Sequence, residues 1–314
     1  MTTALTKIQQ FFSIGESVDR FLLFRIVLGI LVLFKITSLS PHWLDFFGEN
    51  GFFPRDLAQV YSSRPLISYF GITDSLVQYF SITPDQASIA IMYTMGIAAI
   101  CLMAGLFSRL SVSILLFFHI SMMGSFNDYI YGVDYFLASL LFYALFFPLG
   151  QKYSLDHYLE NKIGFHLSKF RIRSAEATTI LGIHLSIVYF VGGITKLGGP
   201  TWWNGGAIWT SLERPDLNIA MRFVEYFDIY YLFVALGVAT IVVELLYPVM
   251  IWFRKTRVVW LALTLGMHLF IGIIMELHYF ASVMIFFNLI AFSGKVEPLT
   301  FSEPEENTSV VIAA

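Results

Sequence analysis

Residues 230–253 read YYLFVALGVATIVVELLYPVMIWF, and Glu244 is the one charged residue in this run. A helix needs about 20 mainly apolar residues to cross the hydrocarbon core of a bilayer. A strand of a membrane β-barrel is shorter, and its side chains alternate between apolar and polar. This run is longer and is apolar on nearly all sides. The stretch therefore predicts a membrane-spanning helix and an all-α fold.

Seven more apolar runs follow the same pattern, although the runs at 110–124 and 278–292 are short. Together with 230–253 they predict about eight transmembrane helices in one bundle. The seven are Phe21–Thr37, Gln86–Leu106, Leu110–Gly124, Val133–Leu149, Ala175–Leu197, Val258–Met275 and His278–Phe292.

The composition excludes several classes of protein. Of 314 residues, 57% are hydrophobic and 13% are charged, about half the charged fraction of a soluble domain, and the mean hydropathy is +0.72. A net charge of -3 provides no basic field for nucleic acid. The single cysteine, Cys101, excludes an internal disulfide and a multi-thiolate metal site, and no metal site is predicted. The lipid bilayer is the first expected partner.

The distribution of Lys and Arg predicts the orientation. With the N-terminus inside, twelve of the nineteen Lys and Arg residues fall at the inner ends of the spans and four at the outer ends. Since positive residues accumulate on the cytoplasmic side, both termini are predicted to be cytoplasmic. The expected location is a bacterial inner or cell membrane, crossed several times.

Three segments are expected along the chain. Residues 1–20 form a cytoplasmic or interfacial segment, 21–293 the transmembrane domain and 294–314 a short acidic cytoplasmic tail. The two long outer loops, 38–85 and 198–229, are rich in aromatic residues, Gly and Pro, which favours interfacial or re-entrant segments.

Ionisable residues inside spans are costly and are therefore candidates for function. Lys35 is expected to extend to the headgroups. His119, His184 and His268 lie in three different spans, either as neutral structural residues or as ligands of a haem or metal in an electron carrier. Glu244 must meet a partner on another helix or stay protonated, and a structural bridge and a role at the site are both open.

Residues 188–207, VYFVGGITKLGGPTWWNGGA, contain the most informative pattern. Lys196 ends a span between two glycine pairs, and glycine permits a backbone or a flat ligand to approach closely. An amine removed from water becomes neutral more readily and can then act as a general base. Lys and Trp at a span end are equally typical of a membrane-interface anchor.

The motif Tyr189-Phe190-x-x-Gly193-Ile194-x-Lys196-Leu197, followed by Trp202 or Trp203 and by Gly205, Gly206 and Ala207, resembles the horizontally transferred transmembrane (HTTM) family. This family includes the membrane domain of vitamin K-dependent gamma-carboxylases. Similar segments occur from Asp19 to Ser293, namely 24–31, 46–55, 105–109, 147–150, 154–156 and 266–268.

The resemblance implies gamma-carboxylase-like chemistry, in which Lys196 would be the general base that deprotonates a quinol such as menaquinol or vitamin K hydroquinone. Asp134 and Glu244 would tune or relay protons as further catalytic residues. The quinol-binding residues would be Gly192, Gly193, Trp202, Trp203 and His268.

Two departures from the carboxylases bear on this expectation. Residues 127–134 contain no histidine, so that Asp128 or Asp134 would substitute for a functional one, and no large extracytoplasmic region follows the last span. Full carboxylation of a docked protein is therefore not expected. The quinol-dependent enzyme would be carboxylase-like or oxygenase-like. The alternatives to it are a non-catalytic membrane partner in maturation or secretion of a peptide or toxin, and the haem or metal carrier.

Overall fold

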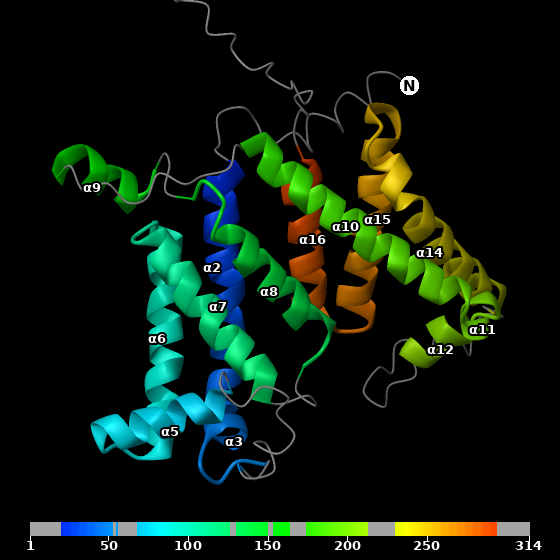
Figure 1. Ribbon diagram of the computed structural model, residues 1–314. Coiled ribbons are helices and arrows are strands. Elements are labelled where there is room, and N and C mark those ends of the chain that lie inside the picture. Colours follow the sequence, from blue (N-terminus) through cyan, green and yellow to red (C-terminus); the bar gives the residue numbers. More distant parts are fainter. Residues whose placement is uncertain are drawn as a thin grey trace, which may run out of the picture.

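The fold is all-helical, as predicted. The computed structural model describes residues 20–52, 55, 68–125, 130–149, 153–163, 174–212 and 230–293, and every regular element in them is a helix (Figure 1). The N-terminal segment and the tail of the expected organisation lie almost entirely outside these residues. The helices are α2 (Arg20–Leu39), η1 (Ser40–His42), α3 (Trp43–Phe47), α5 (Tyr69–Phe80), α6 (Pro84–Ala104), α7 (Ser108–Ser125), α8 (Gly132–Ala144), α9 (Leu155–Ile163), α10 (Ser174–Leu197), α11 (Pro200–Trp203), α12 (Gly206–Leu212), α14 (Tyr230–Met250), α15 (Arg254–Ile274) and α16 (His278–Phe292).

Six of the described helices are long and apolar enough to cross a membrane: α2, α6, α7, α10, α14 and α15. The chain is therefore a multi-pass integral membrane protein. The helices α8 and α16 are apolar but contain 13 and 15 residues, fewer than the roughly 20 that a straight span needs.

Local sequence signals determine where the helices begin and end. Thr83 and Gln86 form a capping box at the start of α6, with Pro84 in the first turn, where its missing N–H costs nothing. The same helix ends at Gly105, whose φ of +69° is in the left-handed region that glycine adopts without steric strain. The helix therefore spans 84–104, two residues from the 86–106 expected from hydrophobicity.

The eight large helices form two units with the same order of elements. Each unit contains three long helices followed by its shortest one: α2, α6, α7 and α8, then α10, α14, α15 and α16. In each unit, short helices follow the first long helix at the same end of the bundle: η1, α3 and α5 in the first unit, and α11 and α12 in the second (Figure 1). The units meet where α16 packs against α8 and α2.

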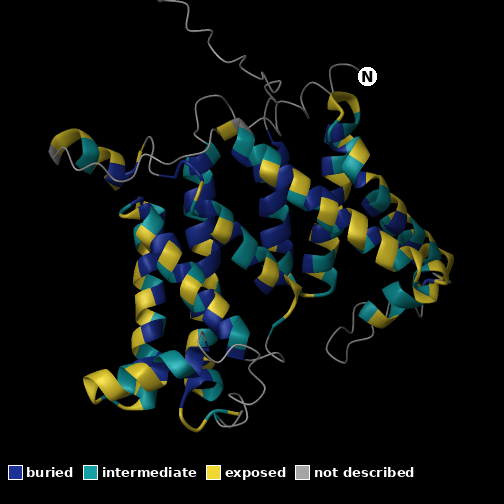
Figure 2. Cartoon of the chain, viewed as in Figure 1, coloured by how far each residue is buried: buried dark blue, intermediate teal, exposed yellow. Residues whose placement is uncertain are grey.

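Phenylalanine rings fill this junction. The Phe24 ring lies 5.3 Å from that of Phe147 and 5.6 Å from that of Phe286, and α16 is among the most buried helices (Figure 2). The outward faces carry exposed apolar side chains, such as Ile97 at 62% and Ile273 at 66% exposure. An apolar exterior around a packed core fits a lipid surround.

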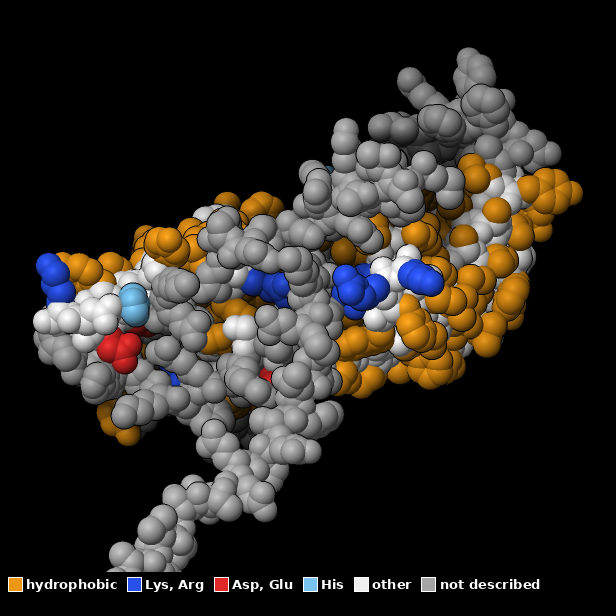
Figure 3. Space-filling view, turned by 90° about the horizontal axis from the view of Figure 1, so that it is seen from above, with side chains coloured by type: hydrophobic (Ala, Val, Ile, Leu, Met, Phe, Trp, Pro, Cys, Tyr) orange, Lys and Arg blue, Asp and Glu red, His pale blue; other side chains and the backbone are white. Residues whose placement is uncertain are grey.

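The end of the bundle that carries α9 is rich in positive charge. Viewed from this end, Lys and Arg side chains lie on the face and hydrophobic side chains surround it (Figure 3). Arg25 is buried inside this end: it is 1% exposed and donates to the carbonyl oxygens of Leu149 and Tyr153, each at 3.0 Å.

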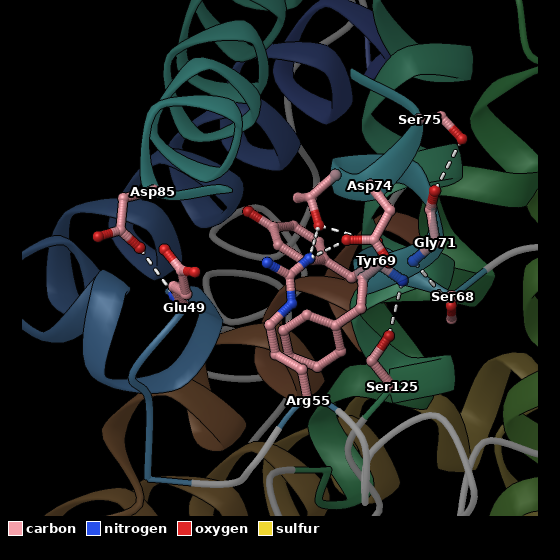
Figure 4. Close-up of polar contacts among 11 residues, drawn as sticks. Glu49, Arg55, Ser68, Tyr69, Gly71, Asp74, Ser75, Asp85 and Ser125 are labelled. Atoms are coloured by element: carbon pink, nitrogen blue, oxygen red, sulfur yellow. Dashed lines mark hydrogen bonds and ion pairs between the residues drawn. The ribbon is translucent and has the colours of Figure 1, made fainter. Parts of the chain in front are cut away.

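At the opposite end of the bundle, the described part of the 38–85 loop forms the short helices η1, α3 and α5. Arg55 donates to Asp74 at 2.6 Å and lies over the Phe70 ring (Figure 4). The Tyr69 hydroxyl lies 2.8 Å from Ser88 Oγ, and burial raises the pKa of this phenol. The Tyr69–Ser88 contact joins α5 to α6, and the contacts of Arg55 join α5 to the segment that precedes it.

Candidate functional site

The centre of the candidate site is an ion pair between two helices of the second unit. Lys196, in the last turn of α10, donates from Nζ to Oε2 of Glu244 on α14 at 2.7 Å. The Glu244 side chain is 9% exposed and that of Lys196 is 22% exposed. The expectation that Glu244 meets a partner on another helix is confirmed.

Two glycines let α10 and α14 approach closely enough for this pair. A Cβ atom on Gly193 would lie 2.9 Å from the backbone nitrogen of Leu245, and one on Gly192 would lie 3.1 Å from Glu244 Oε2 and 3.5 Å from Lys196 Nζ. Gly193 is therefore a helix-packing residue, and the Gly192 backbone lies directly against the charged atoms.

Trp202 covers the pair from the end of the bundle. Its ring centroid lies 5.1 Å from Lys196 Nζ, within the range of a cation–π contact. Its carbonyl oxygen packs onto Gly237 of α14, where an added Cβ would lie 2.3 Å away. Trp203, in contrast, is 47% exposed and donates to the Leu197 carbonyl at 2.9 Å, so that it lies outside the pair.

A buried chain of hydrogen bonds lies on the same faces of these helices. The Tyr247 hydroxyl donates to Asn288 Oδ1 at 2.7 Å. Asn288 Nδ2 donates to the Met284 carbonyl at 2.9 Å and to the Tyr189 hydroxyl at 2.8 Å. Since a carbonyl only accepts, the bond to Met284 fixes the orientation of the Asn288 amide.

The chain ends at His268 on α15. Tyr189 accepts from Asn288, so its own hydrogen is directed to Nε2 of His268, 2.8 Å away. The neutral imidazole then carries its hydrogen on Nδ1. His268 is 3% exposed, and among the described residues Nδ1 has no hydrogen-bond partner. A buried donor left unsatisfied costs about 1–3 kcal/mol, which indicates a position for an acceptor atom.

The sequence model of the HTTM domain matches residues 20–295. This chain belongs to the HTTM family. Comparisons with curated proteins and with solved structures gave no match.

Asp134, predicted to act with Lys196, lies in the other unit of the HTTM domain. It forms an ion pair with Lys35 of α2, and the two side chains are 3% and 10% exposed. Lys35 therefore does not extend to the headgroups: that prediction is wrong, because the first turn of α8 places a carboxylate beside it. Asp128 lies outside the described residues.

The three histidines have separate partners in the HTTM domain. His119 Nε2 contacts the Asp134 carbonyl at 3.0 Å, and His184 Nδ1 contacts the Tyr143 hydroxyl at 2.8 Å, while His268 contacts Tyr189. Within the described ranges no group of three His, Cys, Asp or Glu residues could hold a metal ion.

Sequence reasoning missed the tyrosine and asparagine residues of the chain that ends at His268. Tyr189 precedes Lys196 by two helical turns and Tyr247 follows Glu244 by one, so each shares a face with the charged residue. That spacing was available in the sequence. The partner helix of Asn288 was not, because it depends on how α16 packs.

Proposed function

We propose that this HTTM protein binds a membrane quinol beside Lys196 and Glu244 and that Lys196 is its general base. The observation that carries the proposal is the 2.7 Å contact between Lys196 Nζ and Glu244 Oε2. A base needs a neutral amine, and Glu244 is placed to hold the proton that the amine gives up.

The proton steps follow from this contact. The Lys196 ammonium transfers one proton to Glu244, which leaves a neutral amine and a neutral carboxylic acid. Apolar surroundings favour this neutral pair over the charged pair, because charged groups are costly to desolvate. The amine then accepts a proton from a ligand hydroxyl, and the negative charge left on the ligand oxygen lies beside the new ammonium.

The residues present fit a quinol. Its oxygens need polar partners in an otherwise apolar site, and the Lys196 amine and the unpartnered Nδ1 of His268 are such groups. Trp202 supplies an aromatic wall at the Lys196 ammonium, and the bare backbone of Gly192 lies directly against the pair. When bound, the quinol would supply the electrons for carboxylase-like or oxygenase-like chemistry.

In this mechanism Glu244 holds the proton that Lys196 releases. Asp134 takes no part in the reaction, because it is paired with Lys35 in the first unit. In the non-catalytic alternative, a partner in peptide or toxin maturation, the Lys196–Glu244 pair would only fasten α10 to α14. Quinol binding and turnover distinguish these two functions.

We also propose that α8 and α16 complete eight crossings of the membrane and that the end with α9 is cytoplasmic. Positive residues lie at this end on several helices, including Arg20, Lys162, Arg254 and Lys255. With the positive-inside rule, the end of α10 that carries Lys196 then faces the outer side of a bacterial cell membrane, and Glu244 lies deeper, within the span of α14.

The test measures quinone in the purified protein. The protein in a mild detergent is extracted with solvent, and quinones are quantified by mass spectrometry for the wild type, His268→Phe and the control His184→Phe. We expect near-stoichiometric quinone in the wild type and the control, and at least a tenfold loss in His268→Phe. If the wild type carries no quinone and binds none when menaquinone is added, the proposal is wrong.

A further inference from the structure

The first unit contains a second polar centre that the proposed function does not use. Lys35 on α2 pairs with Asp134 on α8, and His119 on α7 contacts the Asp134 carbonyl. The second unit likewise has a lysine near the end of its first helix, Lys196, and a histidine on its third, His268. Both lysines lie near the end of a long helix that short helices follow along the chain.

The hydrogen bond of His119 defines the hydrogen positions on its ring. The contact from Nε2 to the Asp134 carbonyl is 3.0 Å, and a carbonyl only accepts, so Nε2 carries the hydrogen. Beside the Lys35 ammonium a second positive charge is unfavourable, so that the ring is neutral and Nδ1 presents a lone pair. Within the described part of the chain, no hydrogen bond to this nitrogen is found, although His119 is 2% exposed.

A small cavity adjoins this centre, between α2, α6, α7 and α8. Its volume is about 10 Å³, and Lys35 and His119 are the two residues with ionisable side chains among those that line it. A cavity needs at least about 10–15 Å³ on this measure to hold one water molecule, so this cavity has room for no more than one. The rest of the lining is mainly apolar: Val32, Ile36, Leu39, Trp43, Met95, Leu115, Met122, Leu137 and Leu141.

We propose that this cavity is a binding site for a single water molecule, held by donation from the Lys35 ammonium and by acceptance at His119 Nδ1. A buried water needs at least two polar partners, and these two are complementary because one donates and the other accepts. The water would close a ring from Asp134 Oδ1 through Lys35, the water and His119 back to the Asp134 carbonyl. A proton can then pass between lysine and imidazole inside the first unit.

The opposite possibility is a dry cavity, since a small apolar cavity can stay empty and take up xenon. Two of the residues that line the cavity are Met95 and Met122. Their methyl resonances can show whether the cavity holds water or xenon. Met267 on α15 is a matched control, because it is also packed against the core but does not line the cavity.

The experiment is nuclear magnetic resonance of the full chain in nanodiscs, with carbon-13 in the methionine methyl groups. We expect magnetisation transfer from water to the Met95 and Met122 methyl groups but not to Met267, and no shift of the first two under xenon pressure. His119→Phe should abolish the transfer, and Lys196→Arg should leave it unchanged. Xenon-induced shifts of Met95 and Met122 without transfer from water would overturn the proposal, whether or not His119→Phe folds.

Discussion

Glu244→Gln tests whether the Lys196–Glu244 pair is charged at rest. The substitution keeps the shape of the side chain but removes its charge, so that Lys196 is left beside a neutral amide. Removing one partner of a buried ion pair costs about 3–5 kcal/mol. The Lys196 side chain is 22% exposed and keeps part of its hydration, and we therefore expect a loss of about 2 kcal/mol.

The assay is thermal unfolding of the detergent-solubilised protein, followed by tryptophan fluorescence. A loss of this size should lower the apparent Tm by about 3 °C in a chain of 314 residues. Glu276→Gln is the matched control, because it makes the same chemical change at an exposed residue and should change Tm by less than about 1 °C.

A double variant separates the pair from the surrounding packing. Lys196→Met combined with Glu244→Gln removes both charges, so that the stability loss should be smaller than the sum of the two single losses. An unchanged Tm in Glu244→Gln would refute the reasoning, because it would show that Glu244 is already neutral in the resting protein.

Three further predictions concern topology, packing and an outer tyrosine. In a Cys101→Ala background, Ser211→Cys should react with an impermeant thiol reagent on intact cells and Lys162→Cys only after permeabilisation; the reverse pattern would invert the membrane orientation. Gly193→Ala should destabilise the protein by about 1–3 kcal/mol, because its Cβ would lie 2.9 Å from the Leu245 backbone nitrogen. Gly96→Ala, with nothing within 4 Å of the new Cβ, should stabilise it by up to about 1 kcal/mol, and equal Tm shifts in the two variants would contradict the packing. Burial raises the pKa of Tyr69, so the folded state holds this proton more tightly than the unfolded state and loses stability as the pH rises above about 10. Tyr69→Phe should weaken that alkaline loss in Tm measurements between pH 8 and 11, and an identical alkaline loss in the variant would remove Tyr69 as its cause.

The positions of the long helices could be predicted from the sequence, because a membrane span needs a long apolar run and such runs are visible without tertiary information. Glu244 is an example at the residue level. The neighbours on its helix face carry no charge, so its carboxylate needed a partner on another helix, and Lys196 is that partner. Helix packing was not accessible in the same way. Lys35 has the sequence surroundings of an interfacial lysine, yet α8 places Asp134 against it.

The buried chain of hydrogen bonds that ends at His268 could not be predicted from the sequence either. Tyr189 and Tyr247 share helix faces with Lys196 and Glu244, but tyrosine is common in membrane helices, and this spacing alone does not indicate a site. The chain becomes apparent only when α16 brings Asn288 between the two hydroxyl groups. The unpartnered Nδ1 of His268 is a property of the packed structure and has no signal in the sequence.

The most direct test of the central claim, that Lys196 is a general base for a bound quinol, is oxygen-dependent oxidation of menaquinol by Lys196→Arg. Arginine keeps the positive charge and can still pair with Glu244, but it does not become neutral near physiological pH. We expect Lys196→Arg to fold and retain quinone while its turnover falls at least 100-fold, with Lys35→Arg close to the wild type. Wild-type turnover in Lys196→Arg would contradict the account and leave the Lys196–Glu244 pair as a structural link between α10 and α14.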